Sequence, residues 1–148
     1  MAHRTGSSPR LGDVFLVSFT GTESVQSGLR PGVIFQNNTG NLHSPNVVVL
    51  PMTSRLKRVD QPTHVLVRAV DSGLRVDSVV ICENPQCISK SRLGRWLTVL
   101  PDHYMRQVAA AALLASSAIS FIDPSALSEL RRQADSLDRT NGEVASAC

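Results

Sequence analysis

An arginine and a threonine with suitable chemistry for a phosphodiester stand at the ends of two neighbouring strand candidates. Arg30 closes the polar turn Ser24–Pro31, which has the sequence S-V-Q-S-G-L-R-P, and Thr53 follows the apolar run Val47–Leu50. An arginine fork donates two hydrogen bonds to phosphate oxygens and stays cationic at any relevant pH. RNA carries its own nucleophile, the 2′-hydroxyl, so a site that orients this group and stabilises charge on phosphorus needs no metal ion.

Thr53 suits an orienting role better than proton transfer, because a threonine hydroxyl is a poor base. It can hydrogen-bond the 2′-hydroxyl or a non-bridging phosphate oxygen. Taken singly, each residue also has a structural interpretation, Arg30 as a turn residue in a surface salt bridge and Thr53 as a strand-end cap. The proposed chemistry therefore requires that the two strands bring their ends together.

Polar and cationic side chains flank this pair on both loops. The candidates for RNA binding on these loops are Ser24, Gln26, Ser27, Ser54, Arg55, Lys57 and Arg58. Polar loops of this sort can read the Watson–Crick edges of unstacked bases, while cations hold phosphates and make binding salt-dependent. A solvated loop is the alternative interpretation of the three cations.

The charge of the chain permits a polyanionic partner without demonstrating one. Residues 1–122 hold 12 of the 15 Lys and Arg and 7 of the 12 Asp and Glu, a net charge of +5, and the rest carries −2. A solvated basic face is the commoner reason for such a balance. Charge alone therefore does not decide between a nucleic acid partner and none.

The sequence shows no sign of export, membrane insertion or metal binding. Residues 1–10 lack the apolar core of a secretory signal, and the apolar stretch Val108–Ile122 is shorter than the ~20 residues that span a bilayer. Cys82, Cys87 and Cys148 form no CxxC or Cys/His spacing, which argues against a disulfide framework or a zinc site. We expect a cytoplasmic protein without cofactor or metal.

Short β-rich runs separated by turn residues indicate a mainly β domain. Strands are expected at residues 13–19, 32–37, 46–50, 64–68, 78–82 and 94–100, with a turn at Asn37–Asn41. A helix is expected from Asp102 to about Phe121. Its predicted inward stripe is Met105, Val108, Ala112, Ala115 and Ile119. This pattern predicts a small, strongly curved antiparallel sheet or open barrel closed by a helix.

The tail predicts one further helix. Asp123 can cap it, Pro124 suits its first position, and a narrow apolar stripe recurs at spacings of three, four and three residues, at Leu127, Leu130, Ala134 and Leu137. An isolated helix this short is marginal in water. We therefore expect residues 125–137 to be helical only when the body or a partner covers the stripe.

Several motifs occur together and in one order along the chain. They are L-G-D-V-F-L-V-S-F from Leu11, S-V-Q-S-G-L-R-P-G-V-I-F-Q-N from Ser24, S-P-N-V-V-V-L-P-M-T-S-R-L-K from Ser44, then P-T-H-V, D-S-V-V and K-S-R-L. Over about Leu11 to Ser120 the chain resembles the MazF/PemK toxins of bacterial type II toxin–antitoxin systems. The resemblance implies an SH3-like or CcdB-like barrel in a homodimer. It also implies a metal-independent endoribonuclease acting on single-stranded mRNA and inhibited by a cognate MazE-like antitoxin.

The resemblance assigns roles to individual residues. Arg30 matches the family's catalytic arginine in G-x-R-P, and Thr53 matches its catalytic threonine in P-x-T. His64 stands in the signature P-T-H-V beside the RNA groove, where a structural strand-end histidine is the alternative to a proton shuttle. In relatives the loops around these residues flank the RNA.

The chain also departs from the family pattern near this site. Many relatives carry a carboxylate where this chain has Val25, and a basic residue in the loop where it has Gln86 and Cys87. Glu83 is retained and is the candidate proton acceptor, with a polar strand end as its alternative. Asn84, the next residue, is a candidate RNA contact.

The expected organisation has three parts: a disordered segment 1–11, a toxin-like domain 12–122 and a partly helical extension 123–148. Two other functions remain open on the same scaffold. One is a non-enzymatic toxin similar to the CcdB gyrase poisons, acting through the last helix and the dimer surface. The other is a degenerate toxin that binds antitoxin or nucleic acid without cleavage, suggested by Val25, Gln86 and Cys87.

Overall fold

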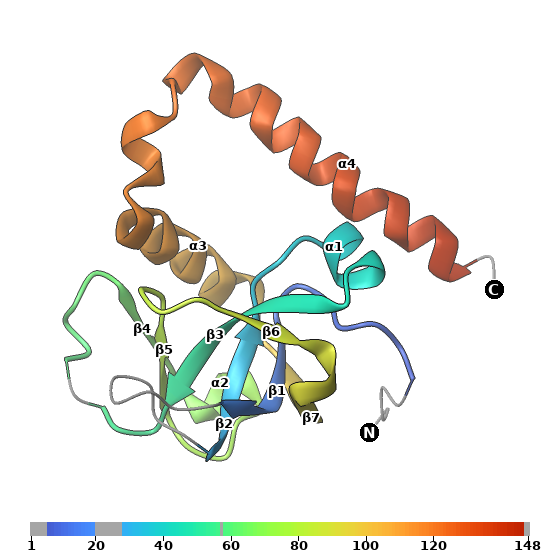
Figure 1. The fold of residues 1–148 in the computed structure, drawn as a ribbon. Coiled ribbons are helices and arrows are strands. Elements are labelled where there is room, and N and C mark those ends of the chain that lie inside the picture. The colour runs from blue at the N-terminus through green and yellow to red at the C-terminus, as the bar shows by residue number, and fades with distance from the viewer. Residues whose placement is uncertain (1–5, 20–27, 57, 147–148) are drawn as a thin grey trace.

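Seven β-strands form the body of the protein, and its longer helices lie to one side of them (Figure 1). The structure, a computed structural model, describes residues 6–19, 28–56 and 58–146. The strands are β1 Asp13–Phe19, β2 Gly28–Ile34, β3 Asn46–Thr53, β4 His64–Val67, β5 Ser78–Ile81, β6 Gln86–Ser89 and β7 Leu93–Val99. The α-helices are α1 Asn38–His43, α2 Ala69–Ser72, α3 Asp102–Ser116 and α4 Leu127–Ser146, and the 3-10 turns are η1 Lys90–Arg92, η2 Ala118–Phe121 and η3 Pro124–Ala126.

The strands pair in the order β4-β5-β3-β2-β1-β7, and β6 also pairs with β3. Every pairing between these strands is antiparallel. One edge of β3 therefore holds β2, while its other edge holds β6 and then β5. The predicted curved antiparallel sheet closed by a helix is confirmed.

The first hydrophobic core lies between the sheet and α3. From α3 it contains Tyr104, Val108 and Ala111, and these pack on strand residues such as Leu50 and Val80. The hydroxyl of Tyr104 donates to Asp71 Oδ1 at 2.7 Å and accepts from the backbone N–H of Arg68 at 3.0 Å. A buried hydroxyl with both partners satisfied fixes α3 on this face.

The second core lies on the other face of β1, β2 and β3. Its members are Phe15, Val17, Phe19, Ile34, Val47, Val49 and Ile88. Gly32 lies among them, where a Cβ would collide with Val49 Cγ1 and lie 3.2 Å from Val17 Cγ2. A glycine at this point therefore lets β2 close tightly over the core.

Several elements differ from the sequence prediction. The second strand begins at Gly28 rather than Gly32, because its first residues pair with β1. The predicted turn at 37–41 is the start of helix α1, for which the Asn37 side chain accepts from the Gly40 N–H at 2.9 Å. β6 was not predicted; of its four residues only Ile88 is buried, so no alternation marks it.

The final helix of the body is shorter than predicted, and its inward face differs. α3 ends at Ser116, because Ser117 adopts φ +57 and starts the 3-10 turn η2. Tyr104 and Ala111 are buried, whereas Ala115 and Ile119 of the predicted stripe are exposed. Met105, Val108 and Ala112 do pack on the sheet.

Beyond η2 the chain turns through η3 and returns as α4, which crosses α1 (Figure 1). The Asp123 side chain accepts from the Ser125 N–H at 3.3 Å, and Pro124 follows it. Two hydrogen bonds tie α4 to α1, from Asn38 N–H to Asp138 Oδ1 at 3.2 Å and from Thr39 Oγ1 to the Leu137 carbonyl at 2.7 Å. In the described part of the chain, no helix is both long and apolar enough to cross a membrane.

Candidate active site

Alternation along the sheet directs Arg30 and Thr53 to one face. β2 pairs with β3 through Gly32 and Pro51, where this ladder ends, and β1 pairs with β2 through Val17 and Arg30. Arg30 lies two residues beyond Gly32, and Thr53 two residues beyond Pro51. Because side chains alternate between the faces of a sheet, both share the face of Gly32 and Pro51.

The Thr53 hydroxyl already accepts one hydrogen bond from its own chain. Its oxygen accepts from the backbone N–H of Arg55 at 3.1 Å, which folds the chain into a turn directly after β3. Among residues 6–19, 28–56 and 58–146, no acceptor takes the hydroxyl proton, which can be donated to a ligand oxygen. This geometry suits a donor that orients a phosphate or a ribose hydroxyl.

A second polar group lies at the start of β4, where His64 is held from both sides. Its Nδ1 donates to the Arg58 carbonyl at 2.9 Å, and its Nε2 lies 2.7 Å from Glu83 Oε1. The imidazole is only 8% exposed. Each ring nitrogen of His64 therefore faces a hydrogen-bond acceptor.

The ionised form of Glu83 is favoured at this position. Partial burial alone would oppose ionisation, but hydrogen bonds from His64, from its own backbone N–H and from Thr63, together with the charge of His64, hold the pKa of Glu83 below its ordinary value. A carboxylate with a lowered pKa is a weaker base than an ordinary glutamate. Its shortest contact is with the histidine, which it orients.

Strand β5 pairs with both β3 and β4, and these pairings show how Thr53 and His64 lie relative to each other. Thr53 pairs with Val79, and His64 pairs with Ile81 two residues further along β5. Both lie on the face opposite to α3, because Val80, between Val79 and Ile81, belongs to the first core. Glu83 follows β5 in a turn in which the Asn84 N–H donates to the Ile81 carbonyl, and it reaches His64 from there.

The structure locates the other predicted site residues to different degrees. Ser54, Arg55 and Arg58 are exposed on the loop after β3, and Arg58 has a positive φ of 57°. Asn84 is half-buried, and its side-chain oxygen accepts from Gln86 Nε2 at 2.6 Å. The remaining predictions fall outside the described residues: Ser24, Gln26, Ser27 and Lys57.

Sequence reasoning missed two residues that shape the site. Gly32 permits the close approach of β2 and β3, and its signal in the sequence was only a glycine inside a β-rich run. Thr63 supports the Glu83 carboxylate, and its carbonyl accepts from the Cys82 N–H at 3.0 Å, which extends the β4–β5 ladder. Neither residue carries a motif that marks it from sequence alone.

A groove lies along α3, meets the candidate site at Glu83 and differs from the site in character. It has a volume of about 520 Å³ and is lined by Phe35, Leu50, Cys82, Glu83, Pro85, Ala109, Ala112, Leu113, Ala115 and Ser116. Its lining is mainly apolar, which does not suit a phosphate chain. Within the described ranges, no three His, Cys, Asp or Glu side chains gather as a metal-binding group.

The order and spacing of these residues match a known family. Residues 10–115 match the family described as the PemK-like, MazF-like toxin of type II toxin–antitoxin systems. The chain belongs to this family. It is 41% identical over 100 residues to the endoribonuclease MazF of Staphylococcus saprophyticus, a match that covers 67% of the chain and 83% of the relative.

Solved structures of PemK/MazF toxins agree with the fold. The Mycobacterium tuberculosis toxin MazF-mt6 superposes with a TM-score of 0.61 at 28% identity, covering 71% of this chain and 96% of that one. MazF from Deinococcus radiodurans gives a TM-score of 0.66 at 23% identity, covering 75% and 98%. A MazE–MazF structure from the same organism gives 0.62 at 22% identity, covering 75% and 98%.

The family match ends within α3. Residues 116–148, which include η2, η3 and α4, lie beyond it. The shared fold therefore accounts for the sheet, α3 and the candidate site, and it leaves the tail unexplained.

Proposed function

We propose that Arg30 and Thr53 are the catalytic pair of an endoribonuclease toxin that cleaves single-stranded RNA. The observation that supports this proposal is the β2–β3 register, whose continuation past Gly32 and Pro51 would set Arg30 opposite Thr53 on one face. The endoribonuclease relative at 41% identity supports the reaction class. The family motif supports the pairing of these two residue types.

The reaction needs no group outside the RNA and the protein. The 2′-hydroxyl loses its proton to a base, the 2′-oxygen attacks phosphorus, and the bond to the 5′-oxygen breaks. The leaving 5′-oxygen takes up one proton, so the 5′ fragment keeps a cyclic phosphate and the 3′ fragment gains a 5′-hydroxyl. Arg30 donates two hydrogen bonds to the non-bridging oxygens and offsets the charge that grows on them. Thr53 donates its hydroxyl proton to the phosphate or to the ribose and orients the nucleophile.

We propose that His64 and Glu83 act beside this pair. His64 holds the Arg58 carbonyl and so fixes the loop that carries the cations, while Glu83 keeps the imidazole in place. Glu83 also remains our candidate for the proton acceptor from the 2′-hydroxyl. If Glu83→Gln abolishes kcat at every pH, Glu83 is the proton acceptor. If the variant keeps kcat and binds RNA more weakly, Glu83 only positions His64 and the loop that His64 holds.

Binding of the RNA itself is assigned to the loops around the pair. Ser54, Arg55 and Arg58 are exposed on the loop after β3 and can hold phosphates. Ser24, Gln26, Ser27, Lys57 and Asn84 are proposed contacts on the sequence pattern. Base preference then depends on the polar side chains, and salt sensitivity on the cations.

The relatives also point to partners. A mycobacterial endoribonuclease has been solved in complex with its cognate antitoxin, and the Deinococcus radiodurans MazF in a MazE–MazF structure. By this likeness we propose that a MazE-like antitoxin neutralises the chain and that it acts as a homodimer in the cytoplasm. Residues 12–122 are the proposed toxin domain, with 123–148 as its extension.

Incubation of purified protein with a long single-stranded RNA in EDTA tests the proposal. We expect the wild type to cut, Arg30→Ala to lose about 10²–10³-fold in kcat, and the matched control Arg106→Ala to cut normally. Arg106 is an exposed arginine on α3, on the opposite face of the sheet. RNA binding without turnover by the wild type would instead indicate a degenerate toxin, and gyrase inhibition that survives loss of Arg30 and Thr53 would indicate a CcdB-like one.

A further inference from the structure

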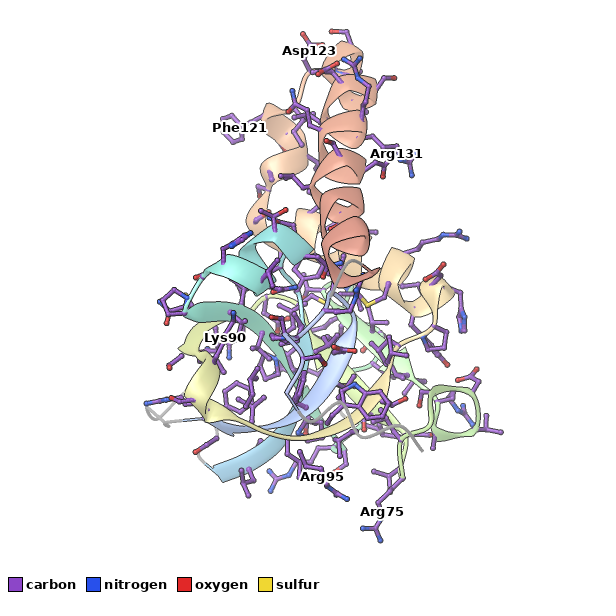
Figure 2. All side chains as sticks on the ribbon, turned by 90° about the vertical axis from the view of Figure 1, so that its right-hand side faces the viewer. Arg75, Lys90, Arg95, Phe121, Asp123 and Arg131 are labelled. Carbon is purple, nitrogen blue, oxygen red and sulfur yellow. The ribbon has the colours of Figure 1, made fainter. Side chains whose placement is uncertain are left out.

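Two exposed arginines that the proposed site does not use, Arg75 and Arg95, lie near the edge of the sheet. Arg95 belongs to β7, the last strand in the sheet order, and Arg75 follows α2. Thr98 Oγ1 of β7 donates to the Ser72 carbonyl at the end of α2 at 2.7 Å, so the chain that leads to Arg75 lies against β7. Figure 2 shows both arginines at the end of the molecule opposite to η2 and η3.

A β-bulge turns Arg95 out of the sheet. Val17 of β1 pairs with Leu93 and Phe15 pairs with Trp96, so β7 has one more residue than β1 between these two pairs. Leu93 and Trp96 both pack on the second core, although they are three residues apart. In a regular strand Arg95, two residues after Leu93, would share its inward face. The bulge keeps Arg95 out of the core and exposes it.

The carboxylates on either side of Arg75 in the chain already have partners. Asp71 accepts from the Tyr104 hydroxyl at 2.7 Å, and Asp77 pairs with Arg68 at 3.1 Å. In the described part of the chain, no ion pair joins either of the two exposed arginines to a carboxylate. Their charges are therefore free to hold an anionic ligand.

Strand pairing relates Arg95 to the proposed catalytic pair. Arg30 pairs with Val17, and Val17 pairs with Leu93, two residues before Arg95. With strands about 4.8 Å apart and a rise of about 3.3 Å per residue, the backbones of Arg30 and Arg95 lie about 12 Å apart. At the rise of ~3.4 Å per nucleotide of a stacked strand, about three to four nucleotides cover this distance. An RNA strand that is cut at Arg30 therefore reaches β7 by passing over β1.

We propose that Arg95 and Arg75 hold phosphates of the RNA strand that flanks the cleaved bond, so that the substrate site extends across the β7 edge of the sheet. This proposal rests on the RNA substrate proposed above. An arginine fork donates two hydrogen bonds to a phosphate, and phosphate contacts add affinity without reading bases. The two arginines therefore raise the affinity for longer RNA and take no part in the bond cleavage.

The spacing favours a nucleic acid strand as the ligand of this surface. RNA carries one negative charge per nucleotide, so a strand with its cleaved phosphate at Arg30 presents further phosphates along the way to Arg95. An acidic protein segment lacks this link to the catalytic pair, and its binding at the same surface is an outcome that the experiment separates.

Cleavage kinetics of the full chain on RNAs of two lengths test the proposal. One RNA is the shortest that the wild type cuts at a mapped bond, and the other carries a long flank on each side. We expect Arg75→Ala with Arg95→Ala to raise KM for the long RNA about tenfold, while kcat and the KM for the short RNA stay within about twofold. The matched control is Arg106→Ala with Arg131→Ala, which removes the same charge from exposed positions on α3 and α4 and should leave both KM values within about twofold.

Salt dependence tests whether the contacts are made to phosphates. Binding is measured with a long RNA that is 2′-deoxy at the cleaved position, and log Kd is plotted against log salt concentration. The slope should be smaller by about 1.4 in the double alanine variant, about 0.7 for each lost contact. Arg75→Lys with Arg95→Lys keeps both charges, so we expect a Kd within about threefold of the wild type. Circular dichroism checks that each variant folds.

Equal KM values of the wild type and the double alanine variant on the long RNA would overturn the proposal. An equal rise on both RNAs would do so too, as would the same rise in the control pair. Weaker binding of a MazE-like antitoxin with unchanged RNA binding would show that the surface holds an acidic protein segment instead. A wild type that binds the long RNA without cutting it would refute the proposed cleavage only, because the Kd comparison still decides the role of the two arginines. A wild type that binds no RNA would overturn both.

Discussion

At the scale of single residues, the site that we propose consists of hydrogen-bond donors. In this proposal Arg30 supplies a permanent positive charge, and Thr53 supplies one hydroxyl donor, because its oxygen already accepts from the Arg55 N–H. Neither group accepts a proton readily. We therefore expect loss of a donor, rather than loss of a base, to dominate the effect of substitutions at these two positions.

Substitutions at Thr53 separate the hydroxyl from the shape of the side chain. Thr53→Val keeps the branched shape and removes the donor, so we expect kcat to fall about 10²-fold. Thr53→Ser keeps the hydroxyl and should stay within about tenfold of the wild type. Single-turnover cleavage rates provide the measurement, and equal losses in both variants would contradict an orienting hydroxyl.

The lowered pKa of Glu83 predicts a pH dependence of stability. A carboxyl whose pKa is lower in the folded than in the unfolded state stabilises the fold above its ordinary value of 4.5, and this contribution disappears as pH falls through the folded-state pKa. The groups that face it are His64 and Thr63. Denaturant titrations of wild type and Glu83→Gln should differ by a constant free energy of unfolding above pH 5 and converge below it. A difference that is the same from pH 7 to pH 3 would refute this assignment.

At the scale of elements, the close contact of β2 with β3 sets the distance between the strands that carry Arg30 and Thr53. Gly32 makes it possible, because a Cβ there would collide with Val49. We expect Gly32→Ala to lower the free energy of unfolding by about 1–3 kcal/mol through overpacking. Gly40→Ala in α1 is the control, since its added Cβ meets only the flexible Gln36 side chain. Equal stability of both variants would show that the strands can shift apart freely.

The elements that the sequence predicted well are those with strong alternation. β1, β4 and β5 were predicted to within a residue, because buried and polar side chains alternate along them or valines fill them. β6 could not be predicted, since Pro85 precedes it and only one of its residues is buried. The residues near Asn37 favoured a turn, and the same Asn chemistry caps helix α1 instead.

The candidate site was accessible to sequence reasoning only in part. The identities of Arg30 and Thr53 and their place at strand ends followed from the motifs, whereas the face that they share depends on a β2–β3 register that no local pattern fixes. The contact of His64 with Glu83 depends on β4 and β5 pairing beyond their last ladder residues. A local sequence pattern does not indicate which strands pair over such a distance along the chain.

The tail helix belongs to the same scale and carries a prediction of its own. α4 contacts the body mainly through α1, and its stripe is partly exposed. A synthetic peptide of residues 125–137 should therefore be largely unfolded in water, because so short a helix is marginal without packing. Far-ultraviolet circular dichroism would reveal a stable isolated helix, which would contradict the dependence on packing.

At the scale of the whole molecule, the two faces of the sheet differ in character. One face carries α3 and the first core, with the apolar groove beside it. The other carries the second core and, at its strand ends, Arg30, Thr53 and His64. Glu83 belongs to both surroundings, because it bonds His64 and also lines the groove.

The central claim is that this chain cuts RNA through the 2′-hydroxyl, with Arg30 stabilising the phosphate. The most direct measurement uses two synthetic RNAs that contain one mapped cleavage site, one of them with a single 2′-deoxy nucleotide on the 5′ side of the cleaved bond. In EDTA, we expect the all-ribose RNA to give a 5′ fragment with a cyclic phosphate, and the 2′-deoxy RNA to stay intact at that bond. Cleavage of both RNAs at equal rates would contradict the account.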